Sequence, residues 1–245
     1  MKKPLNSRRP WIWLGALGIA ACHGPLPATP LAQAIVAGDV KSVEALLKAG
    51  HSADEGSPRP IVWAAREGQV ESIRALVAAG VDVNEMDRAG NGWTPLQHAL
   101  HKRQSGAARI LVESGADVSK RRTGEMPPLM MAAGYGDLSS VNLLLDHGAD
   151  AAFEFQPGIT AVWAAAGGMA LADITDGPPL GTCFPEIVRI LREKAPAASI
   201  HHNIETRFLH LFAKGECVTL LDSLTEGRNQ RGSSRGQEAG RRVRP

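Results

Sequence analysis

Residues 94–100 read Thr-Pro-Leu-Gln-His-Ala-Leu, and this heptad recurs with substitutions along most of the chain. Clear copies begin at Thr29, Arg59 and Pro127, and weaker copies begin at Thr160 and Thr206. The second-position prolines, Pro30, Pro60, Pro95 and Pro128, are spaced 30, 35 and 33 residues apart. A near-constant period in this range is the signature of a repeat protein, in which each unit buries its apolar face against its neighbours.

A second apolar segment follows most copies of the heptad, introduced by one Gly and closed by another. These segments cover residues 46–50, 76–84, 111–118 and 144–150. Proline suits the first position of a helix because its missing N–H would be unpaired there anyway, and a preceding Thr29 or Thr94 can cap the helix. The closing glycines, Gly50, Gly80, Gly115 and Gly148, predict the left-handed turn that ends a second helix.

The pattern resembles the ankyrin repeat, whose units read Thr-Pro-Leu-His-x-Ala-Ala, then Gly, then Val-x-x-Leu-Leu, then Gly-Ala-Asp. The resemblance covers residues 29–226, about six units with the last as a cap. It implies an all-α solenoid of helix-turn-helix units with short loop fingers. The motif histidine is replaced throughout, so we expect the Thr–His hydrogen bonding of the family to be lost; its positions hold Ala32, Val62, Gln97, Met130, Trp163 and Leu209.

The fifth unit departs from the pattern. An insert at about 169–182 separates Gly167-Gly168 from the second helix, which resumes in residues 184–191. Its Asp-Gly-Pro-Pro run at 176–179 predicts a loop. A long loop in a compact repeat is either functional or merely tolerated, so a contact role and a tolerated insertion both stay open.

Two cysteines lie at this end of the array. Alignment with the fourth unit places Cys183 at the helix–helix turn of the fifth unit and Cys217 at the matching turn of the sixth. Packed helices lie roughly 10 Å apart, beyond disulfide reach, but the insert can bring Cys183 closer. A disulfide that pins this end and a pair of separate thiols are the two alternatives.

The resemblance implies a protein partner that contacts the loop tips and the inner-helix face. The tips lie at 54–57, 85–93, 119–125 and 152–157, and their candidate contact residues are Arg88, Trp93, Arg121, Arg122, Phe153 and Phe155. On the inner face, Trp63, His98 and Met131 follow the missing histidine and predict a patch of residue types enriched at interfaces. The alternative is that Trp63 and Met131 simply pack between repeats.

Motifs for catalysis, cofactors and metals are absent from the sequence. We therefore expect no enzymatic activity, no cofactor and no metal site. His201, His202 and Glu205 lie in a predicted linker without a second pair at ligand spacing, which favours a solvated polar turn. The alternative function is a small-ligand binder or an enzyme that uses the insert of the fifth unit.

Residues 1–22 resemble the signal peptide of a bacterial lipoprotein. Lys2, Lys3, Arg8 and Arg9 precede the apolar stretch 11–21, which is much shorter than the roughly 20 residues that span a bilayer. The stretch ends in Ile-Ala-Ala-Cys22, which resembles a lipobox and implies a lipid on Cys22. An ordinary secretory signal is the alternative, and the paired arginines also resemble a twin-arginine export motif.

These residues predict a protein of the cell envelope, anchored to the membrane by lipid and facing the periplasm. His23 rather than Asp follows Cys22, which favours the outer membrane. The tail at 227–245 is rich in Gly, Ser and Arg and is predicted to be disordered. Without the first 21 residues and this tail, the chain has 17 basic and 24 acidic residues, a net charge near −7 that argues against a nucleic-acid partner.

Overall fold

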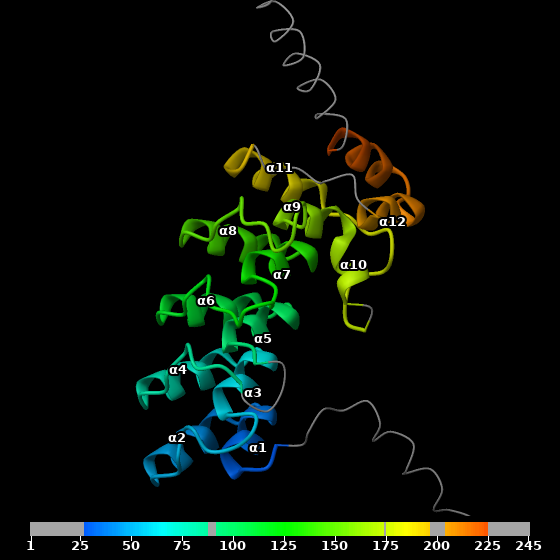
Figure 1. The fold of residues 1–245 in the computed structure, drawn as a ribbon. Helices are drawn as coiled ribbons and strands as arrows, with labels where there is room; N and C mark the ends of the chain where they lie inside the picture. Colours follow the sequence, from blue (N-terminus) through cyan, green and yellow to red (C-terminus); the bar gives the residue numbers. More distant parts are fainter. Residues whose placement is uncertain (1–26, 88–91, 174, 197–203, 225–245) are drawn as a thin grey trace, which may run out of the picture.

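A computed structural model of the chain describes residues 27–87, 92–173, 175–196 and 204–224, which form a stack of helix pairs (Figure 1). The first helices of units one to four are α1 (Pro30–Val36), α3 (Pro60–Arg66), α5 (Pro95–His101) and α7 (Pro128–Gly134). The second helices are α2 (Val40–Lys48), α4 (Val70–Ala78), α6 (Ser105–Glu113) and α8 (Leu138–Asp146). The described residues contain no strand beyond one isolated bridge between Gln156 and Ile159. The all-α repeat solenoid is confirmed.

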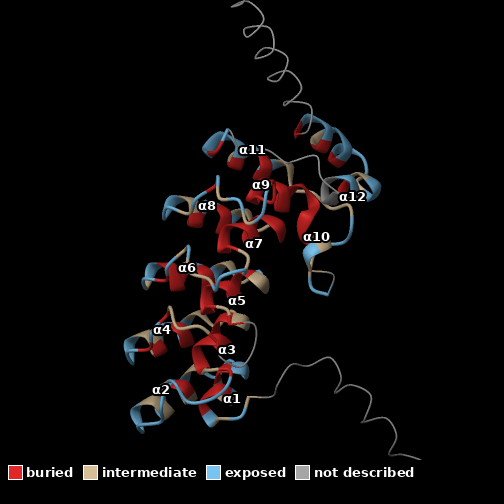
Figure 2. Cartoon of the chain, viewed as in Figure 1, coloured by how far each residue is buried: buried red, intermediate tan, exposed pale blue. Residues whose placement is uncertain are grey.

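Helices of the same kind pack on each other along the stack. The first helices form one layer from α1 to α9 (Ala161–Trp163), and α2, α4, α6 and α8 form the other. Buried residues concentrate in the first helices and where the two layers meet, while the ends of the second helices are exposed (Figure 2). Burial of a Leu or Ile side chain contributes about 1.5–3 kcal/mol, so the interfaces between units supply most of the stability.

The helix boundaries follow the local signals in the sequence. A proline occupies the first position of each of the first helices of units one to four, which we also call the inner helices; the second helices are the outer helices. The side chain of Thr29 accepts a hydrogen bond from the Ala32 N–H (3.2 Å), and Thr160 does the same for Trp163 (3.3 Å). The closing glycines have left-handed φ angles between 85° and 93°, as expected; they are Gly50, Gly80, Gly115 and Gly148.

One turn uses an unusual residue. Eight residues after the proline of each regular unit, the chain adopts a positive φ: 70° at Gly38, 68° at Gly68 and 77° at Gly136. In the third unit this position holds Arg103, with φ 55°, the one residue other than glycine in this conformation within the described ranges. A side chain in the left-handed region is strained by roughly 1–2 kcal/mol.

Polar side chains tie one unit to the next. The Asn84 side chain donates to the Gly115 carbonyl (2.8 Å) and accepts from the Asp117 N–H (2.7 Å). Asp137 accepts from the hydroxyls of Ser105 (2.8 Å) and Ser140 (2.6 Å), so it caps α8 and holds the third unit at once. These bonds fix the register between neighbouring units.

In the third unit, Gln97 replaces the missing histidine and forms hydrogen bonds with Thr94 in place of the Thr–His pair of the family. There, Gln97 Oε1 accepts a bond from the Thr94 N–H at 3.0 Å, while the Thr94 hydroxyl accepts from the Gln97 N–H at 3.2 Å. Gln97 Nε2 also donates to the Met126 carbonyl of the next finger at 3.1 Å. The side-chain amide offers both a donor and an acceptor, and so it links the heptad to the following finger.

In the fifth unit, a kinked helical segment replaces the regular first helix, and we call it the kinked segment. It consists of α9, the π-helical turn η1 (Ala164–Gly168) and α10 (Met169–Ala172). The backbone of Gly167 is not helical (φ 120°), so the segment is two helical pieces joined at a kink. The first four residues of the expected insert are helical, so the insert begins as a loop only at Asp173. Gly168 is required there because a Cβ would lie 2.2 Å from the Trp163 ring.

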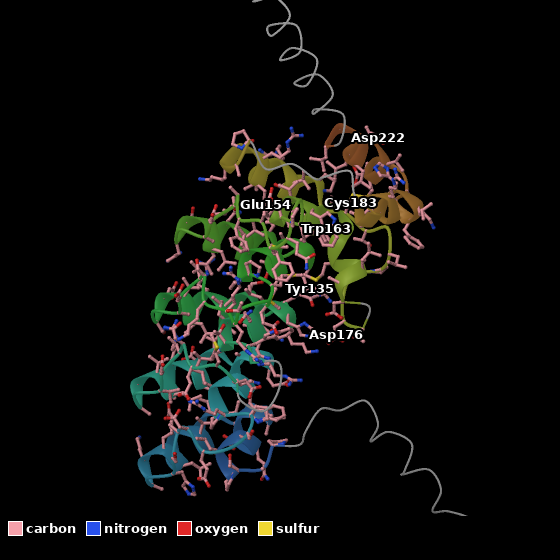
Figure 3. All side chains as sticks on the ribbon, viewed as in Figure 1. Tyr135, Glu154, Trp163, Asp176, Cys183 and Asp222 are labelled. Atoms are coloured by element: carbon pink, nitrogen blue, oxygen red, sulfur yellow. A yellow bond between two sulfur atoms is a disulfide. The ribbon has the colours of Figure 1, made fainter. Side chains whose placement is uncertain are left out.

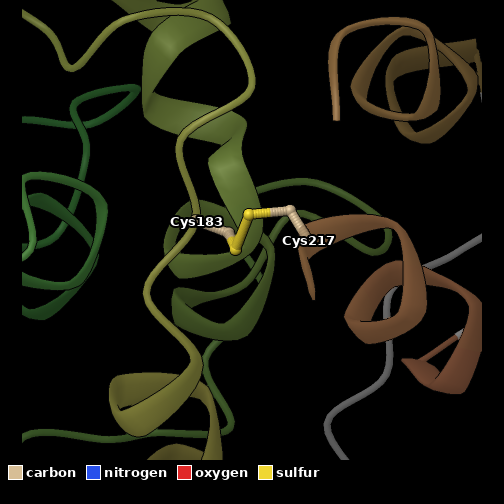
Figure 4. The surroundings of a disulfide bond; sticks show 2 residues. All are labelled: Cys183 and Cys217. Carbon is tan, nitrogen blue, oxygen red and sulfur yellow. A yellow bond between two sulfur atoms is a disulfide. The ribbon is translucent and has the colours of Figure 1, made fainter. Parts of the chain in front are cut away.

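The C-terminal end contains α11 (Pro185–Lys194), α12 (Ile204–Phe212) and helical residues 216–224. A disulfide joins Cys183, just before α11, to Cys217 in the last of these helices, with the two Cα atoms 5.8 Å apart (Figure 4). Within the described ranges, no helix is long and apolar enough to cross a membrane. The predicted signal peptide with Cys22, the tail at 227–245, and Arg88, His201 and His202 lie outside the described residues.

Candidate functional site

A cleft of about 510 Å³ opens between units three, four and five. Five large apolar side chains form much of its wall: Trp93, Met126, Met131, Phe155 and Met169. Five side chains that carry polar groups complete it: His101, Glu125, Tyr135, Asp173 and Thr175. A volume of this size lies in the range of ordinary ligand and side-chain pockets.

The kinked segment of the fifth unit builds one side of the cleft. After the kink at Gly167, α10 runs back along the stack and contacts α7 (Figure 1). The chain then turns sharply, since the Gly177 N–H donates to the Asp173 carbonyl at 3.1 Å. A Cβ on Gly177 would lie 2.1 Å from that oxygen, so this turn depends on glycine.

Five polar side chains fasten the insert to the stack, and we call them the insert latch: His101, Lys102, Tyr135, Asp173 and Asp176. The Tyr135 hydroxyl donates to Asp173 Oδ2 (2.5 Å) and lies 2.8 Å from His101 Nδ1. On the other side of the imidazole, Asp176 Oδ2 lies 3.0 Å from His101 Nε2 and 2.7 Å from Lys102 Nζ. Tyr135 and Asp176 are labelled in Figure 3.

Burial sets the charges of the latch. It lowers the pKa of His101 to about 4, and the positive charge of Lys102 acts in the same direction. Burial alone would raise the pKa of Asp173, but hydrogen bonds from Tyr135, Thr175 and the Asp176 backbone outweigh it and hold that pKa well below its usual range. At neutral pH the imidazole is therefore uncharged while the carboxylate of Asp173 is ionised.

The latch offers each tautomer of His101 one hydrogen-bond acceptor. A neutral imidazole donates through one nitrogen only, and the single proton of the Tyr135 hydroxyl is donated to Asp173. The neutral His101 can therefore donate either to Asp176 through Nε2 or to the Tyr135 oxygen through Nδ1. Burial also raises the pKa of Tyr135, which keeps its hydroxyl protonated as the donor to Asp173.

Trp93 forms the opposite side of the cleft, at the end of the second loop tip (85–93). Its indole N–H donates to Glu125 Oε2 (3.1 Å), which joins two neighbouring fingers. Its ring lies 5.4 Å from His98 and 5.1 Å from His101, measured between ring centroids. Trp93 is therefore held in place from the finger side and from α5.

Two of the predicted loop-tip residues, Trp93 and Phe155, line this cleft. Outside its lining, the Arg121 guanidinium stacks over the Phe153 ring, 4.3 Å from the centroid. Arg122 is exposed, with its side chain close to Gly92.

The predicted inner-face patch is not an exposed surface. Trp63 and His98 are only 6% exposed and Met131 is 3% exposed, so the alternative of packing between repeats is the correct one. Trp63 lies under the Arg66 guanidinium, 5.5 Å from its ring centroid, and His98 faces the buried Asp87 at 3.4 Å. Met131 still lines the cleft wall with its small remaining exposure.

His101, Tyr135 and Asp173 were not identified from the sequence. The spacing of His98 and His101 by one helical turn was a usable signal that both lie on one side of α5. No comparable signal connects them with Asp173, which lies 38 residues beyond Tyr135. Among the described residues, no group of three or more His, Cys, Asp or Glu side chains is arranged to hold a metal ion.

A family model described as ankyrin repeats, with three copies, matches residues 31–122 and, in a second overlapping match, residues 61–155. Together the two matches span just over half of the chain. The chain belongs to the ankyrin-repeat family. Ankyrin repeats generally mediate protein–protein interaction, and the family is typically a non-enzymatic scaffold.

A putative ankyrin repeat-containing protein of Treponema pallidum (strain Nichols) is 33% identical over 132 residues. The aligned region covers 52% of this ankyrin-repeat chain and 43% of the relative, so the match spans less than half of the relative's length. The family match ends at residue 155. The kinked segment, the insert and the disulfide therefore lie beyond it, and they distinguish this ankyrin-repeat protein from a regular array.

Proposed function

We propose that this ankyrin-repeat protein binds a protein partner in the cleft between units three, four and five and along the adjoining finger tips. The observation that carries the proposal is the cleft itself, about 510 Å³ in volume, with Trp93 and Phe155 in its wall. Partly buried aromatic residues beside a pocket are the usual anchors of a protein interface. The Arg121–Phe153 pair extends this surface along the fingers.

The insert belongs to the same surface. It contributes Asp173 and Thr175 to the cleft, and the insert latch attaches it to α5 and α7. Its contribution to the wall supports a contact role rather than a merely tolerated insertion. A partner that enters the cleft would touch two repeats and the insert at once.

The proposed setting is the bacterial cell envelope, with the protein anchored by lipid on Cys22 and facing the periplasm, preferably at the outer membrane. The support is the lipoprotein-type sequence at 1–22 together with the Cys183–Cys217 disulfide, since disulfides persist in oxidising compartments. Cys22→Ser should release the protein from membranes in a fractionation experiment and abolish labelling by a radioactive fatty acid. Continued membrane association of the variant would contradict the anchor.

Site-specific crosslinking tests the interaction. A photoreactive phenylalanine at Thr175, in the cleft wall, should crosslink a partner in intact cells, whereas the same group at the exposed Asn142 on α8 should not. Adding Trp93→Ala to the Thr175 variant should reduce the crosslinked product at least tenfold, because it removes the opposite wall. Equal crosslinking from both positions, or a product that survives Trp93→Ala, would rule out the cleft as the docking site.

A second candidate is a small-ligand binder, with or without enzymatic activity, that uses the insert. The volume of the cleft and the side chains of Asp173 and Thr175 favour this alternative. Native mass spectrometry of the purified chain would distinguish the two functions. A stoichiometric extra mass that disappears in Trp93→Ala would support the small ligand.

A further inference from the structure

The charge of the cleft wall determines which kind of side chain or ligand binds in the cleft. Glu125 and Asp173 contribute two carboxylates, and among the lining side chains that the structure describes none is Lys or Arg. The remaining ionisable groups, His101 and Tyr135, are uncharged at neutral pH because burial lowers the pKa of His101 to about 4 and raises that of Tyr135. The wall therefore carries a net negative charge.

Three neighbouring cationic side chains, Lys102, Arg121 and Arg122, are not among the described lining residues of the cleft. Lys102 Nζ lies 2.7 Å from Asp176 on the far side of the latch. The Arg121 guanidinium is stacked over Phe153, and the Arg122 side chain lies against Gly92. These contacts hold the three cationic side chains outside the described lining of the cleft.

The uncharged part of the wall also suits a cation. Trp93, Tyr135 and Phe155 supply three aromatic rings, and aromatic faces attract guanidinium and ammonium groups within about 6 Å of the ring centroid. Met126, Met131 and Met169 add flexible thioether side chains that pack well against an aliphatic stem. Aromatic rings and carboxylates around one pocket favour an amphipathic cation over an anion or a purely apolar group.

We propose that the cleft binds an arginine side chain of the partner protein, with its guanidinium paired to Glu125 and its stem against the methionines. This inference rests on the proposed function and adds the chemistry of the partner. Arginine fits better than lysine because its planar guanidinium is weakly hydrated, stacks on rings and pairs with a carboxylate through two N–H groups. Glu125 is already oriented for this task by the Trp93 indole N–H.

The test uses the isotope-labelled full chain and two short probes. Acetyl-Ala-Arg-Ala-amide is compared with the same peptide containing citrulline, which has the shape of arginine without its charge. Binding is followed by the NMR signal of the Trp93 indole N–H, identified by its absence in Trp93→Phe. We expect the arginine peptide to bind at least tenfold more tightly than the citrulline peptide. Equal affinities, or no shift with either probe, would overturn the proposal.

The variant Glu125→Gln tests the contribution of the negative charge of Glu125 to binding. The amide oxygen of the variant can still accept the Trp93 N–H, and Glu125 is not part of the insert latch. This variant should weaken binding of the arginine peptide about tenfold and leave the citrulline peptide unchanged. The matched control is Glu113→Gln on the exposed end of α6, which should affect neither probe. An equal effect of both variants would mean that only the overall charge of the protein matters.

The outcome separates this inference from the proposed function. If Thr175 crosslinks a partner in a Trp93-dependent manner but the two peptides bind alike, the docking site stands and its preference for arginine is wrong. The arginine-rich segment 227–245 of this chain is another source of the same chemistry. Replacing the arginines of this segment by glutamine tests that source. If the indole N–H signal of Trp93 in the full chain then moves to the position that it has in Glu125→Gln, the segment occupies the cleft rather than a partner.

Discussion

The four regular units and the C-terminal end of the stack use different means to hold their helices together. In units one to four, seven-residue first helices alternate with nine-residue second helices, and the helices make contact within one unit or between adjacent units. At the C-terminal end, the kinked segment is followed by an insert that a disulfide and the insert latch connect to distant parts of the chain, up to 75 residues away for His101 and Asp176.

This difference concerns function as well as stability. A regular array offers a uniform surface, because each unit repeats the position of its neighbour. The kinked segment breaks that uniformity and forms one side of a cleft against units three and four. In this protein the candidate site is therefore found where the repeat pattern fails.

The largest expected effect lies in the regular region. Leu111→Ala removes a fully buried side chain between units and should lower the free energy of unfolding by about 3–4 kcal/mol. The measurement is urea unfolding followed by circular dichroism. Leu211→Ala, at a position that is 74% exposed, is the control and should change stability by less than about 0.5 kcal/mol. Similar losses for both would mean that burial does not distinguish these sites.

The disulfide should matter only at the irregular end. It closes a segment with a sequence separation of 34, for which chain entropy predicts a contribution of about 3–4 kcal/mol. The double variant Cys183→Ala with Cys217→Ala should lose hydrogen-exchange protection in residues 204–224 and retain it in α1 to α6. A uniform loss along the whole stack would show that the two regions unfold as one.

The latch makes the irregular end sensitive to acid. The folded-state pKa of His101, about 4, lies below its unfolded value of 6.5, so the folded protein binds this proton less readily. The resulting stabilisation is complete above pH 6.5 and is lost as the pH falls from 6.5 toward 4, by about 2 kcal/mol.

His101→Gln should therefore flatten the pH dependence of stability. Urea midpoints of the wild type and the variant are compared at pH 7 and pH 4.5. The exposed His51→Gln serves as the control and should keep the wild-type pH dependence. If His101→Gln loses as much stability as the wild type on acidification, another group accounts for the effect.

The smallest expected effect concerns the left-handed turn of the third unit, where Arg103 stands in place of glycine. Arg103→Gly removes the left-handed side chain and should raise stability by about 0.5–1 kcal/mol. Gly38→Ala, at the same turn position of the first unit, should lower stability by about 1 kcal/mol. Thermal unfolding of both variants measures the difference. A destabilised Arg103→Gly would mean that the arginine side chain makes contacts that outweigh its strain.

Much of the fold could be predicted from residues acting over a few positions. Prolines placed the starts of α1, α3, α5 and α7, and glycines placed the ends of the outer helices. The finger residues Trp93 and Phe155 were also predicted, because loop tips can be located from the repeat period. Trp63 and His98 were misjudged, since the same helical position faces a neighbouring unit when the stack is assembled.

The sequence by itself determined the repeat, its period and the helix boundaries, because Pro, Thr and Gly act on the backbone of their nearest neighbours. Only the tertiary structure decided that Asp173 meets Tyr135 and that Cys183 meets Cys217. Asp173 and Cys183 both follow the kinked segment, where the chain bends at Gly167 and Gly168 lies against the Trp163 ring. These contacts join residues that are distant in sequence and have no counterpart in the regular units, so the repeat pattern could not predict them.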